Sequence, residues 1–232
     1  MDRGDTGGNQ HRQHRHHQLR SGLEQARPVW KCADVKGTLK VVGSKKAELR
    51  SPLDSLRREH ANMRSVLVLV DRQLDLLEAE TGSDPVLLVN ALYYMRKFPS
   101  LVHHPKEDAI FEHLVSIEPA WKAEVDKLRG QHREIYDLED WLIEAALDTP
   151  RVRTPARARL VEFGRHYLDV QRQHSEAEER LLFPQALATL KPRDWDDIEK
   201  GFKAVEDPLF GEHSGERFHL LYEYLMREAA GQ

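Results

Sequence analysis

The chain has 232 residues, of which 40% are hydrophobic and 32% are charged, so it can hold one moderate domain with an appendage. Its only cysteine is Cys32, which excludes an intrachain disulfide framework and is consistent with a reducing compartment. Residues 1–50 carry eleven basic and five acidic residues, whereas the remainder carries 24 and 34. The acidic main body is therefore a poor candidate for binding nucleic acid.

No apolar run in the sequence approaches the roughly 18 residues that are needed to cross a bilayer. The N-terminus also lacks the apolar stretch of a secretory signal. We therefore expect a cytoplasmic protein without a membrane partner.

Residues 1–21 are rich in Gly, Gln, Arg and His and contain almost no apolar side chains, a composition that is typical of disorder. Residues 35–42 could form a short strand or hairpin. We predict that residues 1–48 form a disordered His/Arg-rich tail and linker. Clustered histidines can bind divalent metal, although a flexible tail loses much entropy when it is ordered. Those of the tail are His11, His14, His16 and His17.

The first long helix is predicted from Ser51 to about Glu80. Ser51 can cap this helix, Pro52 suits its first turn, and Asp54 supplies the acid expected near a helix N-terminus. Apolar residues then recur every three or four positions, which indicates one buried face. They are Leu53, Leu56, Met63, Leu67, Val70, Leu74 and Leu77.

A polar turn leads to Pro85, which begins the second helical segment. Pro99 and Pro105 both fall inside this segment. Proline lacks the amide donor and clashes with the preceding turn of a helix. We therefore expect a break or kink between Phe98 and His104, with the helix restarting near Pro105.

The third helix is predicted to begin at Glu118-Pro119 and the fourth at Thr154-Pro155, with the fourth extending to about Leu190. Long helices with short, capped connections are typical of bundles. The sequence thus predicts an all-α protein whose residues 49–190 form an antiparallel up-down four-helix bundle.

Shorter helical segments follow the bundle. Pro192 and Asp194 precede a segment from Trp195 to Val205, and a last amphipathic piece extends from Phe218 to Met226. We expect residues 191–232 to form a C-terminal helical extension packed on the bundle.

A motif of histidine and glutamate occurs twice. His103 precedes Glu107 by four residues, and His174 precedes Glu178 by the same spacing, 71 residues further along the chain. On a helix, a spacing of four places an imidazole and a carboxylate side by side on one face. Either pair alone is more often a surface ion pair, so the repetition carries the prediction.

Two single histidines follow nearly the same offset. His60 and His132 lie 72 residues apart, so each half of the chain holds one histidine and then one histidine–glutamate pair. Each half spans about two helices, the size of a structural repeat. Two helical hairpins that each turn these side chains inward would form a site with approximate two-fold symmetry, suited to two metal ions.

The second helix offers two alternative pairs at this spacing. His103 pairs with Glu107, and its neighbour His104 pairs with Asp108. The prolines nearby leave open which histidine faces the core. The match to His174 and Glu178 favours His103 and Glu107.

Iron, manganese and zinc all accept imidazole nitrogen and carboxylate oxygen, so the ligand types alone do not select the metal. Four histidines and two glutamates supply two metals with two histidines each, and the glutamates can bridge them. With an oxo or hydroxo bridge, each metal keeps room for a small molecule. Carboxylate-bridged di-iron and di-manganese sites in helical bundles follow this scheme.

These residues resemble the hemerythrin-like, or HHE cation-binding, family from about Leu53 to Leu190. The resemblance implies a non-haem di-iron centre that meets oxygen, peroxide or nitric oxide, with manganese or zinc as substitutes. The segments that carry it are residues 59–63, 103–108, 131–135 and 174–184. The ligands it implies are His60, His103, Glu107, His132, His174 and Glu178.

One position departs from the oxygen-carrying members of this family, which have a further histidine four residues after the third-helix ligand. Tyr136 occupies that position here. The resemblance is therefore to the subset with four histidines and two glutamates, which implies sensing, redox chemistry or iron handling.

Tyr167 lies seven residues before His174 and so on the same helix face. It could donate a hydrogen bond to the metal bridge or to a bound ligand. The alternative is that Tyr167 is simply an aromatic residue of the core.

Three functions remain open at this point. The first is a di-iron protein that binds, senses or handles oxygen, nitric oxide, peroxide or iron. The second is a di-iron enzyme that reduces nitric oxide or peroxide or repairs iron–sulfur centres, although relatives of that type carry an N-terminal cysteine region and here only Cys32 is present. The third is a metal-free interaction module. The sequence does not determine the oligomeric state.

Overall fold

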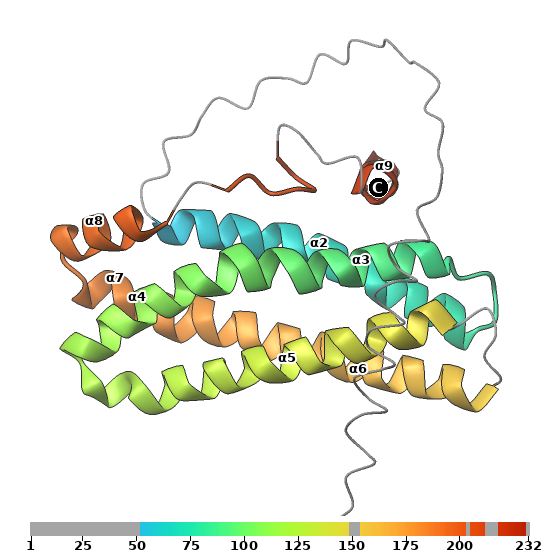
Figure 1. The fold of residues 1–232 in the computed structure, drawn as a ribbon, viewed down its shortest axis with the longest axis horizontal. Helices are drawn as coiled ribbons and strands as arrows, with labels where there is room; N and C mark the ends of the chain where they lie inside the picture. The colour runs from blue at the N-terminus through green and yellow to red at the C-terminus, as the bar shows by residue number, and fades with distance from the viewer. Residues whose placement is uncertain (1–51, 149–153, 203–204, 212–217, 231–232) are drawn as a thin grey trace, which may run out of the picture. The chain divides into compact units, whose positions relative to one another are not determined.

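The computed structural model describes residues 52–148, 154–202, 205–211 and 218–230, and the regular structure within these ranges is helical (Figure 1). The predicted tail and linker, the strand at residues 35–42 and the Ser51 cap lie outside the described residues. The long helices are α2 (Pro52–Glu78), α3 (Pro85–Phe98), α4 (His104–Ile117), α5 (Lys122–Asp148), α6 (Thr154–Ala177) and α7 (Phe183–Thr189).

The long helices form four rods, because α3 continues into α4 and α6 continues into α7. The rod of α2 packs against α3 and α6, and α5 packs against the same two helices. Successive rods therefore alternate in direction around a ring (Figure 1). The predicted all-α fold with a four-helix bundle is confirmed.

The start of α3 is fixed by a side-chain cap. Asp84 accepts hydrogen bonds from the backbone N–H groups of Val86, at 2.9 Å, and Leu87, at 3.1 Å. These are two of the donors that a helix N-terminus leaves unpaired. The preceding turn uses Gly82 at a φ of +88°, a left-handed conformation that glycine adopts without a steric penalty. The predicted helix start at Pro85 is confirmed.

Two wide turns interrupt the second and fourth rods. They are the π-helical segments η1 (Pro99–His103) and η4 (Glu178–Leu182). In η1 the N–H of His104 donates to the carbonyl of Pro99, five residues earlier, and in η4 the N–H of Phe183 donates to that of Glu178. In place of the expected break or kink, the chain forms the wider turn η1. Helical hydrogen bonding continues on both sides of it.

A proline follows each wide turn at the same distance. Pro105 comes two residues after the end of η1, and Pro184 comes two residues after the end of η4. A proline in a regular helix would clash with the carbonyl four residues earlier. The wider turn relieves this clash, and such turns occur frequently at functional sites.

Two apolar clusters fill the bundle, and a polar layer separates them. Along α2, Leu56 belongs to one cluster and Met63 to the other, with His60 between them. Along α5, Leu128 and Ile135 lie on either side of His132 in the same way. Apolar burial on both sides therefore holds the polar layer at one level of the bundle.

The C-terminal part of the described chain contains α8 (Pro192–Gly201) and α9 (His219–Ala230). Phe218 and Leu221 belong to the larger apolar cluster, and the Phe218 ring contacts the ring of Tyr94 with centroids 5.7 Å apart. Among the described helices, none has the length and apolar character required to cross a membrane.

Asp207 attaches the segment before α9 to the bundle. Its Oδ2 accepts hydrogen bonds from the Tyr94 hydroxyl at 3.0 Å and from Asn62 Nδ2 at 3.3 Å. Its Oδ1 accepts from the backbone N–H groups of Leu209 and Phe210. One carboxylate therefore joins α2, α3 and the C-terminal segment.

Replacing Asp207 should detach this segment. In Asp207→Ala the fully buried Tyr94 loses its acceptor, so we expect the free energy of unfolding to fall by about 1–3 kcal/mol. Thermal unfolding and hydrogen exchange at the amides of Leu209 and Phe210 measure the effect. Asp197→Ala, at an exposed position on α8, is the control and should change stability by less than about 0.5 kcal/mol. Equal stability of the two variants would show that Asp207 does not anchor the segment.

Candidate metal centre

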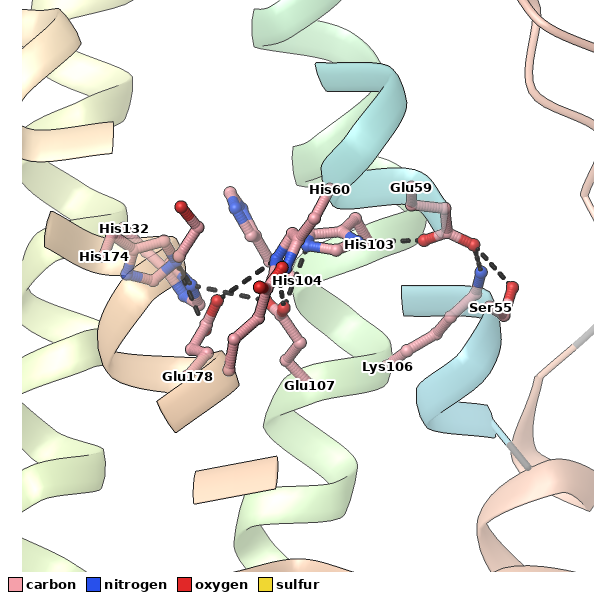
Figure 2. Close-up of polar contacts among 12 residues, drawn as sticks. Ser55, Glu59, His60, His103, His104, Lys106, Glu107, His132, His174 and Glu178 are labelled. Atoms are coloured by element: carbon pink, nitrogen blue, oxygen red, sulfur yellow. Dashed lines mark hydrogen bonds and ion pairs between the residues drawn. The ribbon is translucent and has the colours of Figure 1, made fainter. Parts of the chain in front are cut away.

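The polar layer brings seven metal-binding side chains from all four rods into one buried cluster (Figure 2). Each side chain belongs to a residue that is no more than 5% exposed. All six residues that the sequence predicts as metal ligands lie in this cluster, and His104 joins them. The members are His60, His103, His104, Glu107, His132, His174 and Glu178.

The donor atoms fall into two sets whose members lie within 4.8 Å of one another. We call His60 and His103 the first histidine group, and His104, His132 and His174 the second histidine group. The first set combines the first histidine group with Glu107 and Glu178, and the second combines the second histidine group with Glu107.

Glu107 contacts both histidine groups through different oxygens. Its Oε1 lies 2.9 Å from His103 Nε2 and 3.4 Å from His60 Nε2. Its Oε2 lies 3.7 Å from His132 Nε2. The carboxylate therefore lies between the two groups.

Glu178 spans the two groups in the same manner. Its Oε2 lies 3.3 Å from His60 Nε2, and its Oε1 lies 3.3 Å from His174 Nε2. Two carboxylates that each present one oxygen to either group have the arrangement of bridging ligands between two cations.

The polar atoms at the centre of this cluster suit a cation better than they suit one another. Nε2 of His60 and His103, and both oxygens of Glu107 and Glu178, are buried and have no hydrogen bond of good geometry within the described part of the chain. Unpaired buried polar atoms are costly and rare. Convergent imidazole nitrogens and carboxylate oxygens are the donor set that iron, manganese and zinc accept. The residues present therefore fit a pair of metal ions.

The two glutamates differ in their affinity for a proton. Burial raises the pKa of Glu107, but the charge of His103 and the close polar contacts with His103 and His60 outweigh it, so the pKa lies well below its usual range. Burial and the nearby charge of Glu107 raise the pKa of Glu178. Two like charges this close disfavour simultaneous ionisation unless positive charge is added.

The histidine groups also differ in their affinity for a proton. Burial lowers the pKa of His103, but the charge and close contact of Glu107 and the hydrogen bond to Glu59 raise it above the ordinary value. Burial together with the charge of His132 lowers the pKa of His174 to about 3. His103 of the first histidine group therefore holds a proton more readily than His174 of the second.

Carboxylates orient both rings of the first histidine group, and Figure 2 shows the one behind His103, Glu59. Nδ1 of His103 hydrogen-bonds to Glu59 Oε2 at 2.9 Å, and Nδ1 of His60 hydrogen-bonds to Glu179 Oε1 at 2.9 Å. A proton held on Nδ1 leaves Nε2 free to bind a cation. Glu59 in turn accepts hydrogen bonds from Lys106 Nζ at 2.6 Å and from Ser55 Oγ at 2.9 Å, so its own position is fixed.

Neutral groups orient two rings of the second histidine group. Nδ1 of His104 lies 2.6 Å from the Tyr136 hydroxyl, and Nδ1 of His174 lies 3.4 Å from Gln131 Oε1. The rings of His104 and His132 stack with centroids 3.9 Å apart. These contacts leave the Nε2 atoms of His132 and His174 facing each other at 3.1 Å.

The wide turn η1 explains how two consecutive histidines reach the same site. In a regular α-helix, consecutive side chains point about 100° apart around the axis. His103 ends η1 and His104 begins α4, so the wider turn brings their directions closer together. The sequence left open which of His103 and His104 faces the core, and the structure buries both.

Sequence reasoning missed Glu59, Glu179 and Gln131, which orient the rings, and treated Tyr136 only as the place of an absent histidine. Each of the first three is adjacent in sequence to a predicted ligand. Adjacency to a ligand predicts such a role only where the helix turns the adjacent side chain toward a histidine of another helix. Tyr136, four residues after His132, shares its helix face.

Tyr167 lies in a separate buried network on α5 and α6. Its hydroxyl donates to Glu139 Oε1 at 2.9 Å and lies 3.2 Å from Gln171 Nε2. Both of these hydrogen bonds lie within the network. A role for Tyr167 toward a bound cofactor stays a prediction. Burial raises the pKa of Glu139 to about 8.

The chain matches the family model of the hemerythrin HHE cation binding domain over residues 51–186. This match covers more than half of the chain, so the chain belongs to the hemerythrin HHE cation-binding family. The matched region contains all seven members of the buried cluster. None of the curated proteins compared with the chain matches it.

The buried carboxyl of Glu139 predicts a specific pH dependence. Between about pH 4.5 and 8 the folded state keeps a proton that the unfolded state releases, so stability from this group falls as the pH rises. Glu139→Gln keeps a neutral side chain of similar shape. With a chelator present, its free energy of unfolding should exceed that of the wild type at pH 9 by more than about 1.4 kcal/mol and match it near pH 5.

Chemical denaturation across this pH range measures the difference. Glu144→Gln, at an exposed position on the same helix, is the matched control and should show no such trend. The assignment of the proton to Glu139 would be contradicted if the free energies of unfolding of Glu139→Gln and the wild type differed by the same amount at every pH.

Proposed function

We propose that this chain is a non-haem di-iron protein that binds, senses or handles oxygen, nitric oxide, peroxide or iron. The observation that carries the proposal is the sharing of Glu107 and Glu178 between the two histidine groups, with each oxygen facing a different group. Two ions held by shared carboxylates lie close enough to act on one small molecule.

The donor set is compatible with iron as the resident metal. Iron accepts both imidazole and carboxylate ligands, and the cluster supplies five histidines and two glutamates. His60 and His103 would hold one ion, the second histidine group would hold the other, and both glutamates would bridge them. When bound, such an iron pair supplies reversible electron transfer and an open position for a small ligand.

Burial restricts what can reach this centre. The donor residues are almost fully enclosed, so a small molecule is a better fit than an organic substrate. A cavity of about 400 Å³ lies between α2 and α6, with Arg64, Ser175 and Glu179 in its lining. The cavity therefore reaches the residue that orients His60 without reaching the donor atoms themselves.

The surrounding residues prepare the centre for a ligand. The hydrogen bonds at Nδ1 hold the rings, while the apolar clusters above and below exclude water. A dry site strengthens each electrostatic interaction within it. Glu178, whose pKa is raised, can hold a proton when positive charge is absent and lose it when positive charge is present.

Metal analysis tests the first part of the proposal. Full-length protein reconstituted anaerobically with ferrous iron should hold about two irons per chain and melt at a higher temperature than the metal-free form. Glu107→Gln should lose most of the iron, because a bridging ligand that serves both ions is removed. Glu112→Gln, exposed on the same helix, is the control. Less than about 0.2 iron per chain in the wild type, with no thermal shift, would leave a metal-free interaction module as the better proposal.

Titration of the loaded protein separates sensing from catalysis. Oxygen, nitric oxide and hydrogen peroxide are added in turn, while the optical spectrum and the consumption of each molecule are followed. A sensor should change its spectrum with about one equivalent and then stop. Continued consumption with a reductant present, lost in His132→Ala, would instead identify an enzyme.

A further inference from the structure

The two histidine groups differ in the groups that lie behind their rings. In the first histidine group both outward nitrogens face carboxylates, Glu59 behind His103 and Glu179 behind His60, each at 2.9 Å. A carboxylate in this position increases the basicity of a metal-binding imidazole and fixes its orientation. The first histidine group is therefore supported by negative charge.

In the second histidine group the corresponding partners are a phenol, Tyr136, and an amide, Gln131. Neither carries a formal charge at neutral pH. Asp108 exerts an electrostatic effect on His132, but its side chain is 41% exposed and is paired with Arg129 at 3.0 Å. Solvent screening and this pairing weaken its influence.

Two cations pair with the carboxylates of the first group and offset part of their charge. Lys106 Nζ contacts Oε1 of Glu59, so Oε2 keeps its hydrogen bond to His103. Arg64 contacts the same oxygen of Glu179 as His60 does, but its side chain is 51% exposed and screened by water. Glu59 is 7% exposed, so water screens its contact with His103 less than it screens the contact of Glu179 with His60.

The number of nitrogen donors adds to this asymmetry. The first histidine group offers two imidazoles and the second offers three, while both share the oxygens of Glu107 and Glu178. Imidazole-rich sites suit zinc and ferrous iron, whereas oxygen-rich and more anionic sites suit manganese and ions of higher charge.

Resting on the proposed two-metal function, we propose that the two positions select different cations. The first histidine group takes the harder or more highly charged ion, such as Mn²⁺ or ferric iron. The second histidine group takes the softer ion, such as Zn²⁺ or ferrous iron. Glu59, and to a smaller extent Glu179, are positioning residues that set this preference through the rings they orient.

The test locates two different metals in one protein. Full-length protein without metal receives one equivalent of Zn²⁺ and an excess of Mn²⁺, which offsets the higher general affinity of zinc. Anomalous diffraction at the zinc and manganese absorption edges then locates each ion. Zinc should lie at His132 and His174, and manganese should lie at His60 and His103.

Two isosteric variants and one control isolate the orienting groups. Glu59→Gln removes the buried charge behind His103 and should reduce the zinc-to-manganese discrimination between the two positions by about tenfold. Gln131→Glu adds a carboxylate behind His174. It should make the second position more like the first and so also reduce the zinc-to-manganese discrimination. Glu112→Gln, on the exposed face of α4, should leave it unchanged.

The outcomes distinguish this inference from the function on which it rests. Zinc spread evenly over both positions, or concentrated at the first histidine group, would overturn the inference and leave a two-metal protein intact. If the wild type, Glu59→Gln and Gln131→Glu showed equal zinc-to-manganese discrimination, the orienting residues would not set the preference. The absence of both metals from the seven donors would overturn the proposed function as well.

Discussion

The sharing of two buried carboxylates between two histidine groups is the constraint on which this bundle depends. Glu107 and Glu178 have no exposed surface, and their oxygens approach histidines from all four rods. Two such charges are costly to bury unless positive charge is supplied. The apolar clusters on both sides hold the rods in register, so the ligand layer is assembled by packing and its charge is left for cations to balance.

The wide turns reconcile this layer with helical geometry. The buried His103 and His104 lie where η1 passes into α4, and η4 begins at Glu178 itself. The same turns absorb Pro105 and Pro184, which a regular helix would not accommodate. Proline, a usual sign of helix disruption, here marks where the backbone is adapted to the site.

Approximate two-fold symmetry in the sequence gives way to asymmetry in space. The repeated motifs predict equal halves with two histidines each. The structure instead divides the donors into two and three histidines, with carboxylates behind the smaller group and neutral partners behind the larger. Two metals in such a centre would have different surroundings, which is useful where one ion stays fixed in charge and the other exchanges electrons or ligands.

The sequence by itself determined the helical bundle and predicted six of the seven clustered residues as ligands, with His104 as the alternative to His103, because these features follow from spacing along single helices. Capping residues and turn residues predicted the start of α3 at Pro85 for the same local reason. Only the tertiary structure decided that His104 joins His103 in the cluster. It also decided that Glu59 and Glu179 each orient a histidine ring of a neighbouring rod, and that Tyr167 pairs with Glu139. The hydrogen bonds of Glu59, Glu179 and Tyr167 join residues 28 to 119 positions apart, and no helical period relates side chains that meet only when separate rods pack.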